Sequence, residues 1–326
     1  QHGEDGRGHP PQPLSPHYIW GDALKVWHEN LPESKLINLE TSITTHHTPW
    51  PGKGINYRMS PENVNVLTAA GIDHCSLANN HIMDWSKEGL LETLNTLQSA
   101  GIKFSGAGKN QQQAEEPSVL ETSKGRIIIF SYASQNSGVP PRWQAVAGEP
   151  GVNLLNDFGA DEIHKIKQQI EVLKQGNDIV IFSIHWGPNW GYAIPEKHRQ
   201  FAHMLIDEAG VDLIYGHSSH HPLGMEVYKD KLIVYGAGDF INDYEGISGH
   251  EEFRGELALM YFPELELDSG NLKSLKMVPM EIRKFRLNFA SEKDARWLQK
   301  KLNKESEKLG AGIGRGAENS LWLEWK

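Results

Sequence analysis

The sequence predicts an α/β protein in which parallel strands come first and antiparallel strands follow. One pattern occurs four times: a helix-forming segment, a glycine and a short apolar strand, with the glycines at Gly71, Gly101, Gly176 and Gly210. A glycine after a helix adopts the left-handed capping conformation at little cost. The strands are continuous apolar runs, which is typical of parallel strands buried on both faces. Apolar runs after residue 224 follow one another through turns, which favours antiparallel pairing.

The individual elements can be placed in order along the chain. Residues 1–17 are rich in proline, glycine, histidine and charge, and we expect coil there. Helices are expected over residues 20–30, 60–70, 86–100, 160–175, 195–209 and 291–309. Strands are expected over residues 35–40, 74–78, 126–132, 178–183, 212–215, 225–228, 232–235, 257–262, 275–283 and, as a last edge strand, 321–325. We expect residues 18–290 to form the main domain, with the helix and strand of residues 291–326 packed on it.

The overall composition limits the classes of function. A net charge of −10 argues against general nucleic-acid binding, because no basic field would attract phosphates. No apolar run has the length of a membrane helix, so we expect no transmembrane segment. Cys75 is the only cysteine and lies in an apolar run, which indicates a core residue. The compartment stays open: the protein is cytoplasmic, or exported with a signal outside this sequence.

A histidine cluster after one apolar strand is the first candidate for a functional site. The run Gly216-His-Ser-Ser-His-His places His217, His220 and His221 within five residues. We expect Gly216 to let the chain turn at the end of the strand, so that His217 and His220 converge. Imidazole is the commonest protein ligand for zinc, manganese and iron-type cations. The alternative is a polar loop whose histidines bond only to backbone or water.

Other polar residues also stand at the carboxyl ends of the expected strands. In open α/β sheets, ligands bind beyond these ends. The residues found there are Glu40, Asn80, His81, His185, His217, His220 and Asp239. Histidines at three separate strand ends are poorly explained as ordinary turn residues, so a convergent site is favoured over unrelated polar loops.

The mixture of side chains indicates the kind of metal. A structural cysteine-type zinc site is excluded, whereas carboxylate, amide and imidazole groups suit Mn, Fe or Zn. Five candidate ligands exceed the needs of one tetrahedral ion, and two divalent ions would use them all to hold a phosphoryl oxygen and activate a water. His81 would then donate a proton or stabilise developing charge. Asp84 either orients His81 or is a helix N-terminal charge, and both alternatives stay open.

Three further residues are candidates for contact with an anionic substrate. Lys53 and Arg58 lie in the loop of residues 41–58 and could supply positive charge, and Asp239 follows a strand. Loops of this length inside a domain are often functional. For each basic residue taken alone, ordinary solvated surface is the more common role.

Five short motifs follow one another between residues 20 and 262. They are Asn38-Leu-Glu40, Asn79-Asn-His81-x-x-Asp84, Ile184-His-Trp-Gly187, Gly216-His-x-x-His220 and Gly236-Ala-Gly-Asp-Phe240. As a set, in this order, they resemble the CapA (PGA_cap) family of poly-γ-glutamate capsule-synthesis proteins, within the calcineurin-like metallophosphatase superfamily. The resemblance implies a four-layer α/β/β/α sandwich with mixed sheets and a two-metal site. By position it implies that His81 acts on the reacting group. The metal ligands it implies are Glu40, Asn80, His185, His217 and His220.

The sequence also departs from that family. The family opens with an apolar strand ending in Gly-Asp, whose aspartate is the first metal ligand, and no such strand precedes Tyr18. We expect this opening strand to be absent, so that one metal lacks a ligand and the sheet lacks a central strand. Ser218 stands where many members carry histidine, Asn189 where an acidic residue is frequent, and Asp239 where asparagine is common.

Two functions from different classes agree with these observations. The first is a metal-dependent hydrolase of the phosphoesterase type, linked to poly-γ-glutamate or capsule-polymer metabolism, with an anionic small molecule or polymer as substrate. The second is a non-catalytic factor for assembly or export of an anionic capsule polymer, which keeps the fold as a binding module. Both allow for capsule-synthesis partner proteins. Metal binding and turnover distinguish the two.

Overall fold

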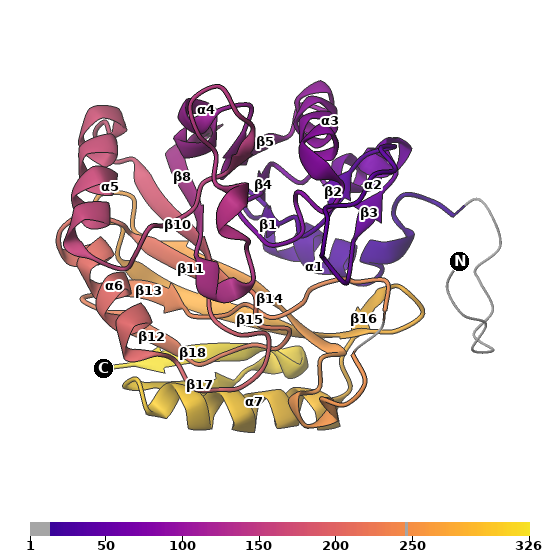
Figure 1. Cartoon of the computed structure of the whole chain (residues 1–326). Coiled ribbons are helices and arrows are strands. Elements are labelled where there is room, and N and C mark those ends of the chain that lie inside the picture. Colours follow the sequence, from indigo (N-terminus) through magenta and orange to yellow (C-terminus); the bar gives the residue numbers. More distant parts are fainter. Residues whose placement is uncertain (1–13, 245–246) are drawn as a thin grey trace.

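The computed structural model describes residues 14–244 and 247–326 and shows a mixed α/β protein (Figure 1). The described residues form three larger sheets and two small two-stranded sheets. The predicted α/β class is therefore confirmed. Most of the coil predicted for residues 1–17 lies outside the described residues.

The first sheet consists of three parallel strands that alternate with helices, as the sequence predicts. Its order is β1-β4-β5. The elements of this part are α1 (Ala23–Asn30), β1 (Leu36–Asn38), α2 (Asn65–Ala69), β4 (His74–Ser76), α3 (Ser86–Ser99) and β5 (Lys103–Ser105). Gly71 and Gly101 follow α2 and α3 with positive φ, so the predicted glycine caps are confirmed. Cys75 is buried, also as predicted.

The second sheet has six strands in the order β12-β13-β11-β10-β8-β7, with parallel strands inside and antiparallel strands at both edges. Its elements are β7 (Ser118–Thr122), β8 (Gly125–Ala133), α5 (Ala160–Leu173), β10 (Ile179–His185), α6 (Glu196–Asp207), β11 (Leu213–His217), β12 (Met225–Tyr228) and β13 (Lys231–Val234). Ile166 of α5 and Phe201 of α6 share a buried apolar cluster with Phe182 of β10, so these helices cover one face. Every residue of β10 is buried, as its continuous apolar run predicts.

The third sheet is antiparallel, with the order β14-β15-β18-β17 and β16 beside β15. Its elements are β14 (Leu257–Leu265), β15 (Leu272–Ile282), β16 (Leu287–Phe289), α7 (Glu292–Glu307), β17 (Ala311–Arg315) and β18 (Leu321–Trp325). The prediction that residues 321–325 form an edge strand is wrong, because β17 pairs along β18 and takes the edge. Two glycines within the five residues of β17 give it a weak strand signal in the sequence.

Short elements complete the described chain. Two small sheets pair β2 with β3 in parallel and β6 with β9 in antiparallel orientation. The bounds are η1 (Tyr18–Trp20), β2 (Ser42–Ile43), β3 (Arg58–Met59), η2 (Pro61–Val64), β6 (Ala107–Gly108), α4 (Gln111–Glu115), η3 (Gln135–Ser137), η4 (Pro141–Trp143), β9 (Gly151–Val152), η5 (Glu251–Phe253) and η6 (Ala317–Asn319).

The sheets stack as layers between helices (Figure 1). On the face of the second sheet opposite α5 and α6, Ile181 and Leu213 share a buried cluster with Leu257 and Leu275 of the third sheet. Leu298 of α7 belongs to the same cluster, and Figure 1 shows α7 on the side of the third sheet that faces away from α5. The order of layers is therefore helix, sheet, sheet, helix.

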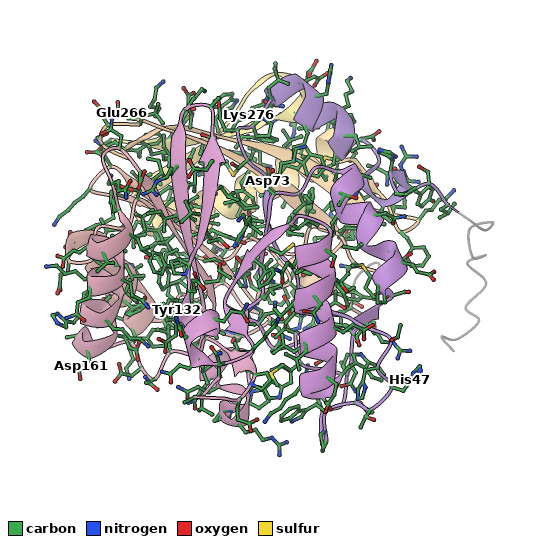
Figure 2. The ribbon with its side chains drawn as sticks, turned by 90° about the horizontal axis from the view of Figure 1, so that it is seen from above. His47, Asp73, Tyr132, Asp161, Glu266 and Lys276 are labelled. Carbon is green, nitrogen blue, oxygen red and sulfur yellow. The ribbon has the colours of Figure 1, made fainter. Side chains whose placement is uncertain are left out.

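The parallel strands of the first two sheets run in the same direction. Viewed from above (Figure 2), Asp73, which precedes β4, lies toward the edge of the molecule marked by Glu266. Tyr132, near the end of β8, lies toward the opposite edge, where His47 is labelled. The carboxyl ends of these strands therefore lie toward one edge of the molecule, which is where the sequence places the candidate ligands.

A large cavity extends along β1. Its volume is about 2990 Å³, and its lining includes Ile37 of β1, Ile181 and Leu213 of the second sheet and Met260 of β14. All three residues of β1 are partly exposed, although the strand is apolar in two of its three positions. Within the described ranges β1 pairs only with β4, so its other backbone edge has no strand partner there. No helix in the same ranges is long and apolar enough to cross a membrane.

Candidate metal centre

Strands β10 and β11 place two of the predicted ligands next to each other. His185 and His217 are the last residues of these strands and oppose each other in the parallel register. The prediction that Gly216 makes a turn is wrong, because it lies inside β11 and has no positive φ. A glycine is required there for space: a Cβ atom would lie 2.2 Å from the carbonyl oxygen of Tyr235.

The two imidazoles are hydrogen-bonded to each other. His185 Nδ1 lies 2.7 Å from His217 Nδ1, and His217 Nε2 lies 2.9 Å from the Ser183 hydroxyl oxygen. Both ring nitrogens of His217 are therefore engaged, whereas the buried Nε2 of His185 has no hydrogen-bond partner in the described structure. Burial lowers the pKa of His185 well below its usual value and the pKa of His217 to about 3, so both rings are neutral at pH 7.

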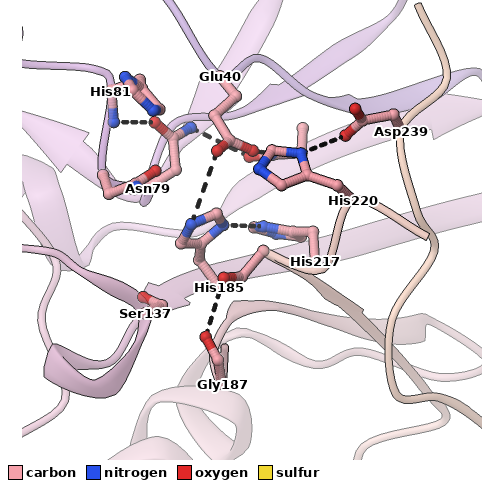
Figure 3. Close-up of polar contacts among 12 residues, drawn as sticks. Glu40, Asn79, His81, Ser137, His185, Gly187, His217, His220 and Asp239 are labelled. Carbon is pink, nitrogen blue, oxygen red and sulfur yellow. Dashed lines mark hydrogen bonds and ion pairs between the residues drawn. The ribbon is translucent and has the colours of Figure 1, made fainter. Parts of the chain in front are cut away.

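Glu40 faces the open nitrogen of His185. Its Oε1 atom lies 3.9 Å from His185 Nε2, and Figure 3 shows Glu40, His185 and His220 pointing toward one another. The Asn38 side chain, two residues earlier, donates from Nδ2 to Glu40 Oε2 at 2.9 Å. Burial, and then the charge of Asp239, raise the pKa of Glu40 to about 7. A carboxylate with this raised pKa would be stabilised by a nearby cation.

His220 is held in place by a carboxylate. Its Nδ1 atom lies 3.0 Å from Asp239 Oδ1, and the Tyr244 hydroxyl and the Asn242 amide donate to Asp239 Oδ2 at 2.7 and 3.0 Å. Burial lowers the pKa of His220, but the hydrogen bond and charge of Asp239 outweigh it, and the pKa is raised. Because Nδ1 is occupied by Asp239, Nε2 is the nitrogen available to a ligand.

His81 and Asp84 form a second pair of this kind. His81 Nδ1 lies 2.6 Å from Asp84 Oδ2, and the Asp84 side chain is fully buried. Of the two alternatives for Asp84, the structure shows the contact with His81. Asn79 accepts the backbone N–H of His81 at 3.1 Å and donates to the Leu39 carbonyl oxygen at 2.9 Å, which ties the loop after β4 to the end of β1. Burial lowers the pKa of His81, against the opposing effect of Asp84.

The three predicted substrate contacts all have partners within the protein. Lys53 reaches the Asp84 carboxylate. Asp239 holds a histidine ring, as described above. The Arg58 guanidinium lies over the Trp85 ring, 4.3 Å from its centroid. Substrate contact by these three residues stays a prediction.

Three of the predicted ligands carry atoms that are open to a cation. Asn80 Oδ1 and His185 Nε2 are buried without a hydrogen-bond partner in the described part of the chain, and Glu40 adds a carboxylate. Such oxygen and imidazole donors suit Mn, Fe or Zn, so the residues fit a divalent cation in their chemistry. The arrangement of these side chains, unlike their chemistry, does not fit a metal ion: among the described residues, no three His, Cys, Asp or Glu side chains are arranged to hold one. In addition, His217 uses both ring nitrogens in bonds to its neighbours.

Sequence reasoning missed four residues that shape this site. Asn38 and Ser183 each stand two residues before a predicted ligand, and the period of two along a strand could have identified them. Tyr57 and Tyr244 come from loops, and the Tyr57 ring lies 4.2 Å from the ring of His81. Neither tyrosine carries a local sequence signal for this role, because loop paths depend on distant contacts.

One family model and several known proteins are similar to this chain. A family model described as bacterial capsule synthesis protein PGA_cap matches residues 3–244. A protein of Mycobacterium tuberculosis named "Probable polyglutamine synthesis accessory protein" is 42% identical over 316 residues, which cover 96% of this chain and 83% of that protein. The capsule biosynthesis protein CapA of Bacillus anthracis is 28% identical over 193 residues, or 59% of this chain and 45% of that protein. The PGA biosynthesis protein CapA of Bacillus subtilis is 30% identical over 191 residues, with shares of 59% and 48%. The chain therefore belongs to the PGA_cap family of bacterial capsule synthesis proteins, as its five motifs predict.

Proposed function

We propose that this chain is a metal-dependent hydrolase with a phosphoesterase-type two-metal site, linked to the metabolism of poly-γ-glutamate or another anionic capsule polymer. The observation that carries the proposal is the meeting of Glu40, His185 and His220 at strand ends of two different sheets. The His81–Asp84 pair lies beside them. Hydrolytic metal sites need several ligands from separate elements and a proton donor next to them. The relatives' names supply the link to the capsule polymer.

The open atoms of the site suggest which residues would hold the cation. These are the Glu40 carboxylate, Asn80 Oδ1, His185 Nε2 and His220 Nε2. His217, the fifth predicted ligand, would first have to turn away from its two present hydrogen bonds. A pair of divalent ions there would polarise a phosphoryl oxygen and lower the pKa of a water.

His81 is the proposed proton donor. Its Nδ1 is occupied by Asp84, so Nε2 is the atom that can exchange a proton with a leaving group or stabilise developing charge. The carboxylate of Asp84 would in turn stabilise the imidazolium form of the ring. The Tyr57 ring packs 4.2 Å from the His81 ring and limits its rotation.

The layers of the fold support the metallophosphatase-like sandwich that the resemblance implies. Helices α5 and α6, the second sheet, the third sheet and α7 follow one another in that order. We propose that the cavity along β1 is the place of the family's opening strand. It is lined by β1 and β14, which are both terminal strands of their sheets in the described residues.

A non-catalytic role in the assembly or export of an anionic polymer is the second candidate. It is favoured by the two hydrogen bonds of His217, which use both ring nitrogens of this predicted ligand. The names of the relatives, which speak of synthesis and accessory functions, agree with both candidates. In the second case the polymer and partner proteins would bind without turnover.

Hydrolysis assays with Mn²⁺, Fe²⁺ or Zn²⁺ distinguish the two candidates, with bis(p-nitrophenyl) phosphate and poly-γ-glutamate as substrates. We expect metal-dependent turnover that falls by about 10²-fold or more in His185→Ala. His164→Ala is the control, because this exposed histidine of α5 bonds to Gln168 and should be dispensable. Polymer binding without turnover under every metal would establish the second candidate instead.

A further inference from the structure

Lys53 is a buried cation beside the His81–Asp84 pair. It belongs to the loop of residues 41–58, and only 16% of its side chain is exposed. Its ammonium contacts Asp84 Oδ1 and the carbonyl oxygen of Asn80, and it lies 3.0 Å from His81 Nδ1. Two of its three N–H donors are used by these oxygens. The ammonium therefore points at the protein rather than at a substrate.

The Asp84 side chain is fixed from several directions. Oδ1 accepts from Lys53, while Oδ2 accepts from His81 Nδ1 at 2.6 Å and from the backbone N–H of Tyr57 at 2.7 Å. The Asp84 carbonyl oxygen also accepts the backbone N–H of Trp50 at 2.8 Å. The same loop thus reaches Asp84 at Trp50, Lys53 and Tyr57. Of the loop's three donors to Asp84, only Lys53 carries a charge of its own, so its contact is an ion pair as well as a hydrogen bond.

These contacts determine which nitrogen of His81 carries the proton. A carboxylate only accepts hydrogen bonds and an ammonium only donates them. His81 Nδ1 is closer to the Asp84 oxygen, at 2.6 Å, than to Lys53 Nζ, at 3.0 Å, so we assign the proton to Nδ1. In the neutral ring Nε2 is then the bare nitrogen, so it must first take up a proton before the resulting imidazolium can donate one to a leaving group. The bond from Lys53 to Oδ1 fixes the plane of the carboxylate, and with it the direction of the bond to His81.

We propose that Lys53 is a positioning residue: by holding the Asp84 carboxylate and the Asn80 carbonyl, it sets the orientation and the tautomer of His81. Its kinetic consequence rests on the proposed hydrolase function, whereas its structural consequence does not. The ammonium also couples His81 to Asn80, whose side-chain oxygen is one of the open ligand atoms. A shift of the loop would therefore move the proposed proton donor and a proposed ligand together.

A buried ion pair without any role in the site is the alternative, and the chain contains a matched example. Lys231 is 14% exposed and bonds to Asp212 at 2.8 Å and to the carbonyl oxygen of Ser269. It thus has nearly the same burial as Lys53 and the same kinds of partner. Lys231 is the first residue of β13, whereas the candidate site lies at the carboxyl ends of the strands. Lys231→Met therefore controls for the loss of a buried ammonium.

Nitrogen NMR of the histidine rings in metal-free, substrate-free protein tests the structural part. The His81 signals are assigned by their loss in His81→Gln. We expect Lys53→Met to change the His81 ring from the single Nδ1-protonated tautomer to a mixture, while Lys231→Met leaves its signals in place. Lys53→Arg, which keeps a cation next to Asp84, should restore the wild-type signals. If Lys53→Met does not fold, Lys53→Gln replaces it with the same expectation.

Kinetics with bis(p-nitrophenyl) phosphate and Mn²⁺ provide the second measurement. Lys53→Met should lower kcat by about tenfold or more and change KM by less than about twofold, because in this proposal the ammonium binds Asp84 and Asn80 rather than the substrate. A raised KM at unchanged kcat, or His81 signals that do not move, would overturn the proposal. A protein without any turnover contradicts the proposed hydrolase function alone, because the NMR measurement does not depend on it.

Discussion

Two histidines of the site are each anchored by a carboxylate through Nδ1. His81 is bound by Asp84 at 2.6 Å and His220 by Asp239 at 3.0 Å, which leaves Nε2 of each ring for other partners. Partners of this kind fix the ring and make its free nitrogen more basic. Asp239 thereby gives His220 a partner with a full negative charge, which a neutral amide would lack.

Replacing that charge should weaken cation binding. We expect Asp239→Asn to lower the affinity for Mn²⁺ by about tenfold or more. An uncharged amide at position 239 makes His220 Nε2 less basic and therefore a weaker metal ligand. Isothermal titration of the metal-free protein with Mn²⁺ measures the change. Asp207→Asn is the control, since Asp207 bonds to Tyr228 and Lys229. Equal affinities of Asp239→Asn and the wild type would show that Asp239 does not support a ligand.

The raised pKa of Glu40 predicts a pH dependence of stability in the metal-free protein. The pKa of Glu40 is 4.5 for the free side chain and about 7 in the folded protein. The protonated form therefore stabilises the fold. This contribution to the free energy of unfolding is fully present below about pH 4.5 and is lost as the pH rises through about 7. Because 25% of the side chain is exposed, we expect about 1–2 kcal/mol rather than the full value of the shift.

Urea unfolding of the wild type and Glu40→Gln at about pH 5 and about pH 8 measures this effect. The wild type should lose stability relative to the variant between the two pH values. A gain with rising pH would mean that the carboxylate is stabilised in its charged form by groups of the protein.

At the scale of elements, local signals predicted much of the structure. Helix α3 lies within one residue of the predicted range at both ends, and α6 within two, because caps and apolar faces are properties of the segment itself. The neighbouring positions of His185 and His217 at the ends of β10 and β11 were also predictable, since parallel strands end at a common edge. Strand β17 was missed, and β18 was misplaced at the edge, because their pairing depends on residues far away in the sequence.

The role of Gly216 likewise depends on a neighbouring segment. The sequence indicates a turn, whereas the structure shows a close approach: a Cβ at this position would lie 2.2 Å from the Tyr235 oxygen and 2.5 Å from Trp186 Nε1. Only the fold brings these atoms together. The sequence therefore draws attention to Gly216 but does not show why a glycine is required there.

Adding one methyl group at Gly216 should therefore be costly. We expect Gly216→Ala to lower the free energy of unfolding by about 3 kcal/mol, because β11 must move away from the backbone of Tyr235. Gly312→Ala is a matched control in a strand, since its Cβ would meet Asn303 Oδ1 at an ordinary 3.4 Å and should change stability by less than about 0.5 kcal/mol. Chemical denaturation of both variants checks this, and equal losses would contradict the close-approach argument.

For the whole molecule, the cavity along β1 is the main departure from a closed core. Its volume of about 2990 Å³ is well above the roughly 300–1,000 Å³ of small-molecule pockets, and apolar side chains of three sheets line it. The sequence signals neither the size nor the position of this space, because both depend on how distant segments pack together.

A strand supplied to this space should stabilise the molecule. We expect a chain extended at its N-terminus by an apolar strand of about six residues ending in Gly-Asp to melt about 5 °C higher or more, because it buries apolar surface and completes the edge of β1. The same extension with its apolar residues changed to serine is the control. Calorimetry of both chains decides the matter, and identical Tm values would refute the assignment of the cavity to a strand.

The central claim is that strand ends of two sheets bring Glu40, Asn80, His185 and His220 together as a cation site. Elemental analysis tests it most directly, after incubation with Mn²⁺, Fe²⁺ or Zn²⁺ and removal of the unbound metal. We expect the wild type to retain about one or two divalent ions per chain and a folded Glu40→Gln, His185→Ala double variant to retain none. A wild-type protein without metal above background, or a double variant that binds as much as the wild type, would contradict the claim.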